Sequence, residues 1–345
     1  MRKLLVLALA GCAIPAVAAV TVTSPSQNGE ELESPFGLVA SASACSGQSI
    51  ASMGYSFDSQ SDTTIFGNTN SISVSASYSG LTLGATHTLH VKSWGSSGAS
   101  CTADVTFTAV ANPATTVPTN ATVVSEIQSN PSYTWSATYD SGTNGSSETN
   151  GSSQLATSPS LSGDSREFIT NYYDDGGERY DTSFGQDETS QNFLYDTWVY
   201  VSSATTQGGL ANLEFDMNQV TSNGQTVIYG FQCDGWNGVW DYTENSGTPT
   251  NYTDTWVHST QACNPANWTT NMWHHLQVTY SRDTGGNVTY QSVWLDGVEQ
   301  DINTTVPSSF ALGWGSTLLT NFQTDGKTGS GLIEAYLDEL TVSRW

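Results

Sequence analysis

The segment Leu213–Asn218 constrains the fold more than any other part of the chain. Its sequence, Leu-Glu-Phe-Asp-Met-Asn, alternates strictly between apolar and polar residues. Such alternation is typical of a half-buried β-strand, whose apolar side chains face a core while the polar ones share the opposite face. The polar set is Glu214, Asp216 and Asn218. Two carboxyl groups and an amide in a row form a solvated surface, a clamp for a metal ion or sugar hydroxyls, or the acid/base pair of a glycosidase.

The N-terminus predicts export. Residues 1–18 combine a basic start at Arg2 and Lys3, an apolar stretch and an Ala-Val-Ala ending, the pattern of a signal peptide cut after Ala18. The alternative is the Leu-Ala-Gly-Cys box of bacterial lipoproteins, which would place a lipid anchor on Cys12. We favour free secretion because the apolar stretch before Cys12 is short. No later segment approaches the roughly 20 apolar residues that span a bilayer, so we expect a soluble extracellular or cell-surface protein.

Four cysteines remain once the signal is removed, and export permits disulfides. Three pairings are open to four cysteines. The simplest joins neighbours along the chain, Cys45 with Cys101 and Cys233 with Cys263. A zinc site is disfavoured because no two of these cysteines have the short spacing of zinc motifs.

The charge balance excludes several kinds of partner. The chain has 8 Lys and Arg residues against 32 Asp and Glu residues. So few cations cannot form the basic surface that nucleic acid or anionic lipid requires, and anionic polysaccharides are poor ligands for the same reason. Neutral glycans remain, as do ligands held through calcium. Acidity by itself indicates only that the protein stays soluble.

The N-terminal part reads as one all-β unit. Residues 19–110 contain short Ser-, Thr- and Val-rich runs separated by turn residues, which predicts a β-sandwich. The opening Val20–Pro25 and the run His87–Trp94 resemble the Ig-like modules of bacterial secreted proteins, which implies a spacer or adhesion element. Residues 111–121 are a Pro/Thr-rich linker.

Residues 122–345 form the second expected domain. They lack a convincing amphipathic helix and contain many aromatic-rich strands, which predicts a large two-sheet jelly roll. The strands that we expect are Phe193–Val201, Ala211–Asn218, Thr226–Gln232, His274–Tyr280, Val288–Leu295 and Glu334–Val342. The Asp296-Gly297 pair is the signal of a two-residue hairpin turn.

Three segments of this domain resemble a known superfamily. They are Trp-His-His-Leu-Gln-Val-Thr at 273–279, Val-Trp-Leu-Asp-Gly-Val at 293–298 and Tyr-Leu-Asp-Glu-Leu at 336–340. In this order they are similar to elements of the concanavalin A-like lectin/glucanase superfamily, in its laminin-G-like (LamG) branch. Lectins, adhesion modules, glycosidases and lyases share that fold, so the resemblance implies a fold and leaves the function open.

The same resemblance suggests a catalytic reading of the alternating strand. Laminarinase-like and cellobiohydrolase-like glycosidases present Glu-x-Asp-x-(x)-Glu on one strand, which implies Glu214 as nucleophile and Asp216 as its partner. Asn218 departs from this pattern because an amide cannot exchange a proton as a carboxyl group does. Either another acid, such as Glu334 or Asp338, takes that role, or the groove binds without cutting. We favour binding without cutting.

Flat aromatic rings flanked by amides and carboxylates are typical of sugar-binding sites. The segment between Cys233 and Cys263 supplies such residues, and we expect it to be a binding loop closed by a disulfide, with at least half of its rings in the core. Trp198 and Tyr200, on another strand, are candidates for the groove floor. The carbohydrate-binding residues that we expect are Trp236, Trp240, Tyr242, Trp256, Asn218 and Trp198.

Metal sites are weakly indicated. The acidic loops Asp174–Glu178 and Asp181–Glu188 offer oxygen ligands for calcium, although neither matches an EF-hand. His274 and His275 are adjacent on a strand and should point to opposite faces, so they cannot readily share one ion.

These observations lead to one hypothesis and two alternatives. The chain is expected to be a secreted, monomeric protein that binds a neutral polysaccharide. The first alternative is a retaining β-glycanase with Glu214 as nucleophile. The second is a non-catalytic adhesion module whose aromatic residues lie in the core.

Overall fold

The computed structural model describes residues 20–25, 28–61, 64–78, 80–110, 117–140, 148–248, 250–310 and 312–345. The expected signal peptide, with Cys12, lies outside the described residues, as do residues 111–116 of the expected linker. Within the described ranges the regular structure consists of strands and one 3₁₀ turn, Pro265–Asn267, which confirms the all-β class. None of the helical structure described is long and apolar enough to cross a membrane.

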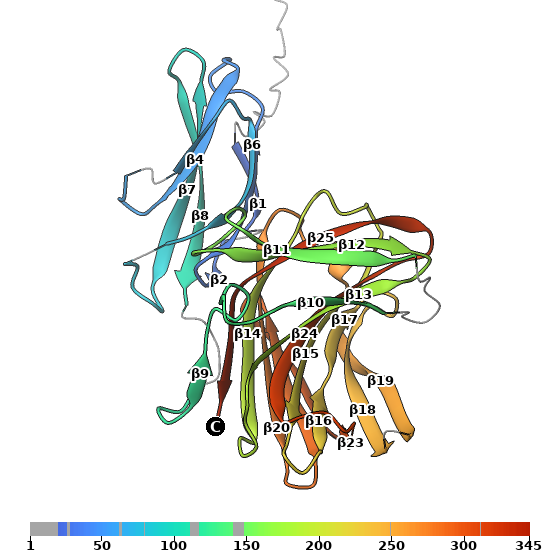
Figure 1. Cartoon of the computed structure of the whole chain (residues 1–345). Coiled ribbons are helices and arrows are strands. Elements are labelled where there is room, and N and C mark those ends of the chain that lie inside the picture. The colour runs from blue at the N-terminus through green and yellow to red at the C-terminus, as the bar shows by residue number, and fades with distance from the viewer. Residues whose placement is uncertain are drawn as a thin grey trace, which may run out of the picture. The chain divides into compact units, whose positions relative to one another are not determined.

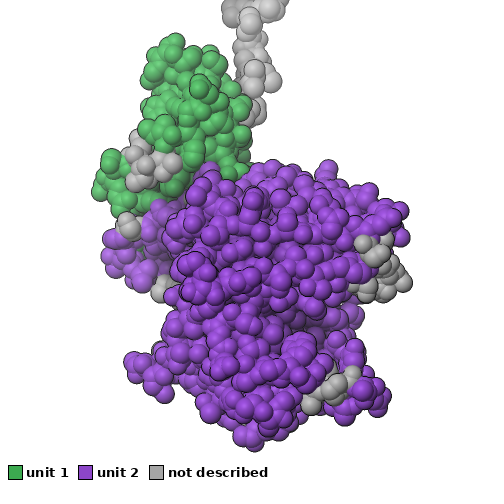
Figure 2. Space-filling view, in the orientation of Figure 1, with its two compact units in different colours: residues 1–30, 38–73, 85–108 green, residues 31–37, 74–84, 109–345 purple. Residues whose placement is uncertain are grey.

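The chain divides into two compact units (Figure 2). Residues 1–30, 38–73 and 85–108 form unit 1, and residues 31–37, 74–84 and 109–345 form unit 2. The N-terminal strands form two antiparallel sheets, in the orders β1-β3-β6 and β2-β8-β7-β4-β5. Their bounds are β1 Val20–Ser24, β2 Glu30–Leu32, β3 Phe36–Ala42, β4 Ile50–Phe57, β5 Thr64–Gly67, β6 Ser71–Ala76, β7 Thr86–Gly95 and β8 Ser100–Ala109. Cys45 and Cys101 form the expected disulfide. The Ig-like assignment of this part stays a prediction.

Unit 2 contains two large antiparallel sheets (Figure 1). The nine-stranded sheet has the order β10 (Ser136–Asp140), β13 (Gly177–Gly185), β24 (Thr317–Gly326), β15 (Leu210–Val220), β17 (Phe231–Asp234), β18 (Val239–Thr248) and β19 (Asn251–Ala262), with β16 (Thr226–Tyr229) paired to β15 and β23 (Ser309–Phe310) paired to β16. The eight-stranded sheet has the order β11 (Asn150–Ala156), β12 (Ser165–Tyr173), β25 (Ser330–Arg344), β14 (Asn192–Val201), β20 (Trp273–Arg282), β21 (Asn287–Leu295) and β22 (Val298–Pro307), with β9 (Thr122–Val124) on β25.

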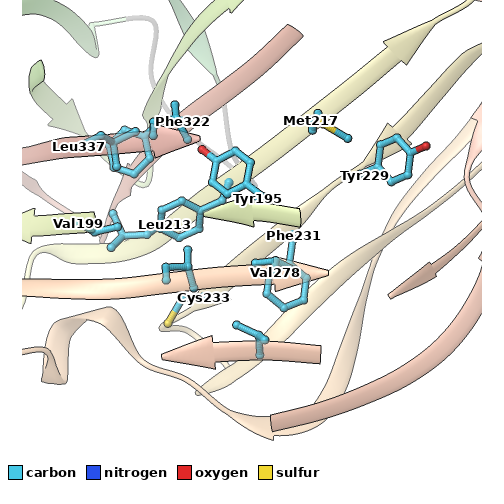
Figure 3. Close-up of a cluster of buried hydrophobic side chains, with 14 of the residues drawn as sticks. Tyr195, Val199, Leu213, Met217, Tyr229, Phe231, Cys233, Val278, Phe322 and Leu337 are labelled. Carbon is cyan, nitrogen blue, oxygen red and sulfur yellow. The ribbon is translucent and has the colours of Figure 1, made fainter. Parts of the chain in front are cut away.

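The core of unit 2 collects apolar side chains from both sheets (Figure 3). Leu213, Phe215 and Met217 on β15 are 0% exposed and belong to it, as their alternation predicts. The ring of Phe215 lies 5.5 Å from that of Phe322 on β24. Val278 and other residues of the eight-stranded sheet close the core from the other side. Because apolar residues occupy one face of β15, the polar set must lie on the other.

Local sequence accounts for the details of several strands. The expected strand Thr226–Gln232 is interrupted at Gly230, where a Cβ atom would overlap the side chain of Thr243. The Asp296-Gly297 dipeptide joins β21 to β22, with φ of 52° and 80° at its two residues. Positive φ at both positions is what a two-residue type I′ hairpin turn requires, so this sequence signal is confirmed.

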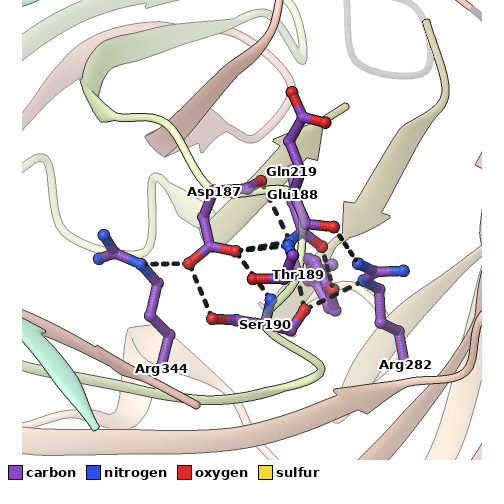
Figure 4. A network of polar contacts seen from close by, with 8 residues as sticks. Asp187, Glu188, Thr189, Ser190, Gln219, Arg282 and Arg344 are labelled. Carbon is purple, nitrogen blue, oxygen red and sulfur yellow. Dashed lines mark hydrogen bonds and ion pairs between the residues drawn. The ribbon is translucent and has the colours of Figure 1, made fainter. Parts of the chain in front are cut away.

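A polar network fixes the segment after β13 (Figure 4). The carboxylate of Asp187 accepts hydrogen bonds from Nε of Arg344 at 2.8 Å and from the backbone N–H of Ser190 at 2.8 Å. Arg282 donates from Nε to the carbonyl oxygen of Ser190 and from Nη2 to that of Glu188. Two of the few cations of the chain are therefore engaged in holding this turn.

Candidate functional site

A groove with a cavity volume of about 780 Å³ lies on the nine-stranded sheet, on the face opposite the core. Glu214, Asp216 and Asn218 line it, so the structure brings together the three polar residues that the alternation singled out. They are only 6%, 8% and 6% exposed, because neighbouring side chains surround them.

Strand register arranges the floor of the groove in rows. The central row crosses six strands in the order Arg179, Gln323, Glu214, Gln232, Asp241 and His258. A parallel row contains Gly177, Asp325, Asn212 and Asp234. Glu214 therefore sits near the middle of the sheet, with an amide side chain on each neighbouring strand.

Hydrogen bonds hold these side chains in place. Gln232 accepts a hydrogen bond from Nδ2 of Asn212 at 2.9 Å and donates to Asp241 at 3.3 Å. Asp241 in turn pairs with Nδ1 of His258 at 2.9 Å. Asn321 on β24 donates to Oε1 of Glu214 at 3.3 Å. The floor is thus a connected amide–carboxylate network, which fixes each rotamer before a ligand arrives.

Burial shifts the protonation of the groove. It raises the pKa of Glu214 well above its ordinary value, and repulsion from Asp216 adds to the effect. Burial also raises the pKa of Asp216 to about 6, although the backbone N–H of Phe231 donates to its Oδ1 at 3.0 Å. Burial raises the pKa of Asp325 to about 7, with repulsion from Asp140 as the next cause. Each shift reflects the cost of holding a carboxylate away from water.

Acidic side chains far outnumber basic ones in the groove. Arg179 is its one Lys or Arg residue among the described lining residues, and its Nη1 lies 4.0 Å from Oδ2 of Asp140. The lining carboxyl groups belong to Asp140, Asp181, Glu214, Asp216, Asp234, Asp241, Asp254 and Asp325.

Aromatic rings also line the groove, and three of them are exposed. Trp236, Tyr252 and Trp314 have 42%, 54% and 47% of their surface open to solvent. Trp256 lines the groove and is partly buried. Of the tryptophans expected to bind sugar, the structure therefore brings Trp236 and Trp256 to the same groove as Glu214.

The expected binding loop is a β-hairpin. Cys233 and Cys263 form the expected disulfide, but strands β18 and β19 occupy most of the chain between them. Trp240 is 0% exposed and stacks on Phe231 at 5.1 Å, and Tyr242 also belongs to the core. These two rings face the other side of β18 from Asp241, so the structure does not place them in the groove.

Trp198 lies outside the groove as well. It is on β14 of the eight-stranded sheet, where its ring stacks on His275 at 4.2 Å. It belongs to a cluster separate from the main core, and Tyr200 packs against that cluster. His275 bonds Asp196 through Nε2, whereas the neighbouring His274 bonds Asp296 through Nδ1, as expected for strand residues with opposite orientations.

The acids considered for the third catalytic position are also elsewhere. Glu334 and Asp338 lie on β25, which belongs to the eight-stranded sheet. Asp338 is 0% exposed and accepts hydrogen bonds from Gln128 and from the backbone N–H of Leu161. Glu334 accepts a hydrogen bond from the hydroxyl of Tyr336. Neither lines the groove, so a second acid would have to come from the lining carboxyl groups.

The arrangement of possible metal ligands differs from the calcium expectation. Among the described residues, one group of three offers ligand atoms within 4.8 Å of one another, Asp234, Asp241 and His258. A histidine nitrogen suits zinc or another transition metal better than calcium. Asp234 already accepts hydrogen bonds from the backbone of Trp236 and Asn237, and Asp241 binds His258, so the group is satisfied within the protein.

Strand β24 contributes groove residues that the sequence analysis missed. Asn321, Gln323 and Asp325 line the groove, while Phe322 lies in the core. The sequence carries a signal for this strand, since the polar residues Asn321, Gln323 and Asp325 occupy alternate positions. Phe322 and the β-branched Thr324 lie between them. Trp314, which lies before this strand, carries no comparable pattern.

No protein-family model and no curated protein matches this chain. Among solved structures, a carbohydrate-binding module of the β-sandwich superfamily is 12% identical, covering 93% of this chain and 96% of its own, with a TM-score of 0.32. An endo-1,3-β-glucanase from Streptomyces sioyaensis is 10% identical, covering 67% and 99%, with a TM-score of 0.35. The alginate lyase vAL-1 from Chlorella virus is 11% identical, covering 57% and 93%, with a TM-score of 0.33. Likenesses this distant carry no function to the chain.

Proposed function

We propose that this chain is a secreted carbohydrate-binding protein whose concanavalin A-like domain holds a polysaccharide without acidic groups in the groove of the nine-stranded sheet. One observation carries the proposal: three exposed aromatic rings line the same cavity as a hydrogen-bonded floor of amides and carboxylates. Aromatic faces pack against the C–H faces of sugars, and the polar floor binds hydroxyl groups.

Asn218 supports this proposal independently. Its side chain lines the groove and is 6% exposed, yet it makes no hydrogen bond with any described residue. A polar side chain with so little access to water normally has a partner. A sugar hydroxyl in the groove would satisfy both the donor and the acceptor of this amide.

The test is retention of the full chain on a panel of insoluble and soluble polysaccharides, including β-glucans, xylan and mannan. Trp236→Ala should weaken retention at least about tenfold, because truncating a ligand-stacked tryptophan removes on the order of 1.5 kcal/mol or more. Tyr173→Ala is the matched control, since Tyr173 is 44% exposed and does not line the groove. Failure to bind any glycan, in this panel or among the oligosaccharides of the next subsection, would refute the proposal.

A retaining β-glycanase is the second candidate. Glu214 and Asp216 are carboxylic residues at alternate positions of β15, both in the groove, and burial together with their repulsion raises the pKa of Glu214 well above its usual range. A carboxyl group with a raised pKa beside a second carboxyl group is the combination that acid/base catalysis uses. Asn218 at the third position favours binding without cleavage. Catalysis is established if the protein releases reducing ends and Glu214→Gln abolishes the release. If no reducing ends are released, the chain is a binding protein.

Two further expectations belong to this proposal. The first is that an N-terminal Ig-like unit serves as a spacer. The second is export with cleavage after Ala18, which N-terminal sequencing of the exported protein would distinguish from lipidation of Cys12. The adhesion alternative requires tryptophans that are shielded from solvent. If acrylamide quenches the tryptophan fluorescence and Trp236→Ala reduces this quenching, Trp236 is open to solvent and the result argues against the adhesion alternative.

A further inference from the structure

We propose that the groove is selective for a glycan that carries free amino groups, so that a cationic amino-sugar chain binds more tightly than its neutral counterpart. This inference rests on the proposed function and specifies the ligand class of the same groove. It departs from the neutral glycan that composition alone suggested, because the structure shows where the charges lie.

The groove has a large excess of carboxyl groups over basic groups. Eight carboxyl groups line it, against Arg179 and the histidine His258. Six of the eight come from strands β15, β17, β18, β19 and β24, and all eight line one cavity. Charges gathered in a cleft with low-dielectric walls focus the field on whatever enters it.

The other cations of residues 117–345 are engaged elsewhere. Arg282 and Arg344 hold the turn around Asp187. Arg166 donates from Nε to the carbonyl oxygen of Gln128 and lies over the ring of Trp135. Lys327 donates to the carbonyl oxygen of Gly235 at 3.5 Å. These contacts leave the groove acidic, and a cation from the ligand would supply the missing countercharge.

The individual carboxyl groups have acceptor capacity to spare. Asp325 is 3% exposed and accepts hydrogen bonds from amide side chains, from Nε2 of Gln323 at 3.1 and 3.4 Å and from Asn212. Asp216 accepts hydrogen bonds from the backbone N–H of Phe231 and from the side chain of Asn321. An ionised carboxylate has about four lone-pair sites, so each can still accept hydrogen bonds from an ammonium group. The raised pKa values of Asp216 and Asp325, about 6 and 7, agree with carboxyl groups that lack a cationic partner.

The aromatic rings and Asn218 point to the same kind of ligand. Trp236, Tyr252 and Trp314 offer faces for sugar rings, and those faces also attract an adjacent cation. Asn218 offers a hydroxyl group an amide that has no hydrogen-bond partner among the described residues. A neutral chain would use the rings and the amide but would leave the carboxylates without charge compensation. An amino-sugar chain uses all three features.

The experiment compares oligosaccharides of one backbone that differ in charge. The full chain is titrated by calorimetry at pH 7.0 with short β-1,4-linked oligomers of glucosamine, of N-acetylglucosamine and of glucose, at low and high ionic strength. The neutral polysaccharide panel of the preceding section is run in parallel. We expect the glucosamine oligomer to bind at least about tenfold more tightly than both neutral oligomers, and this advantage to shrink in high salt because groove charges are then screened.

Two groove variants and one control separate specific binding from general attraction to an acidic protein. Asp325→Asn on the floor and Asp254→Asn on the wall should each lower the affinity for the amine-bearing oligomer severalfold more than the affinity for the neutral oligomers, because only the charged ligand loses an ionic partner. Asp254 is exposed, so its substitution does not disturb the core. Glu244→Gln is the control, because Glu244 is exposed on β18 and does not line the groove.

Each outcome has one meaning. The inference is established if the protein prefers the amine-bearing oligomer, the two groove variants reduce that preference and Glu244→Gln does not. Equal affinity for charged and neutral oligomers, retention of neutral polymers alone, or equal effects of all three substitutions would overturn it while leaving the proposed function intact. Binding of neither the oligomers nor any polymer of the panel would overturn both.

Discussion

Replacing Asp325 by Asn should stabilise the protein at neutral and alkaline pH. Burial raises the pKa of Asp325 to about 7, so the folded protein holds this carboxyl group protonated under conditions in which the unfolded chain ionises it. Asn has nearly the shape of a protonated Asp and does not ionise. The variant therefore retains the packing of the protonated form and loses the penalty of charging a buried group.

The magnitude follows from linkage between protonation and folding. An Asp in an unfolded chain has a pKa of about 3.9, whereas Asp325 in the folded protein has a pKa of about 7. The raised pKa therefore stabilises the fold fully below about pH 3.9, and this stabilisation is lost as the pH rises through about 7. At 1.36 kcal/mol for each pKa unit, the loss amounts to about 4 kcal/mol in total, of which about 2–3 kcal/mol falls between pH 5 and pH 8. Asp325→Asn should thus raise the free energy of unfolding by about 2–3 kcal/mol more at pH 8 than at pH 5.

Urea denaturation of the full chain at the two pH values, followed by tryptophan fluorescence, measures this difference. Glu244→Gln serves as the control, since Glu244 is exposed and should show no pH-dependent effect. If Asp325→Asn destabilised the protein at pH 8 at least as much as at pH 5, the carboxylate would be ionised and stabilising in the folded state. The reasoning about an uncompensated acidic groove would then be refuted.

Three further predictions concern the groove and its supports. Gly177→Ala should lower the free energy of unfolding by about 1–3 kcal/mol in urea denaturation, because the added Cβ would overlap the carboxylate of Asp325; an unchanged value would contradict this contact. Replacing Cys233 and Cys263 by Ser should cost about 3–4 kcal/mol by the chain-entropy model, and the loss should be global rather than local because the enclosed hairpin belongs to the core. Trp236→Ala should leave the thermal midpoint within about 2 °C of wild type, since an exposed ring contributes little to packing; a larger fall would place Trp236 in the core.

The strand alternation in the sequence was sufficient to determine much of this protein. It separated Leu213 and Phe215 from Glu214 and Asp216 by face, because side chains on a strand point alternately to opposite sides. The Asp-Gly pair at 296–297 predicted its hairpin because few residue pairs accept positive φ twice. Both disulfides were also predicted, from separation along the chain and export.

Tertiary structure decided the rest, because alternation says which side chains share a face but not which strands become neighbours. Trp236 and Trp240 lie four positions apart in the sequence, yet one is 42% exposed in the groove and the other is 0% exposed in the core. Asp325 joined the row of Asn212 only through the pairing of β24 with β15, a register set more than a hundred residues away. Glu334 lies outside the groove because its strand, β25, pairs with β12 and β14 in the other sheet. Net acidity was visible in the composition, but its concentration in one groove arises from the assembly of distant strands into a single surface.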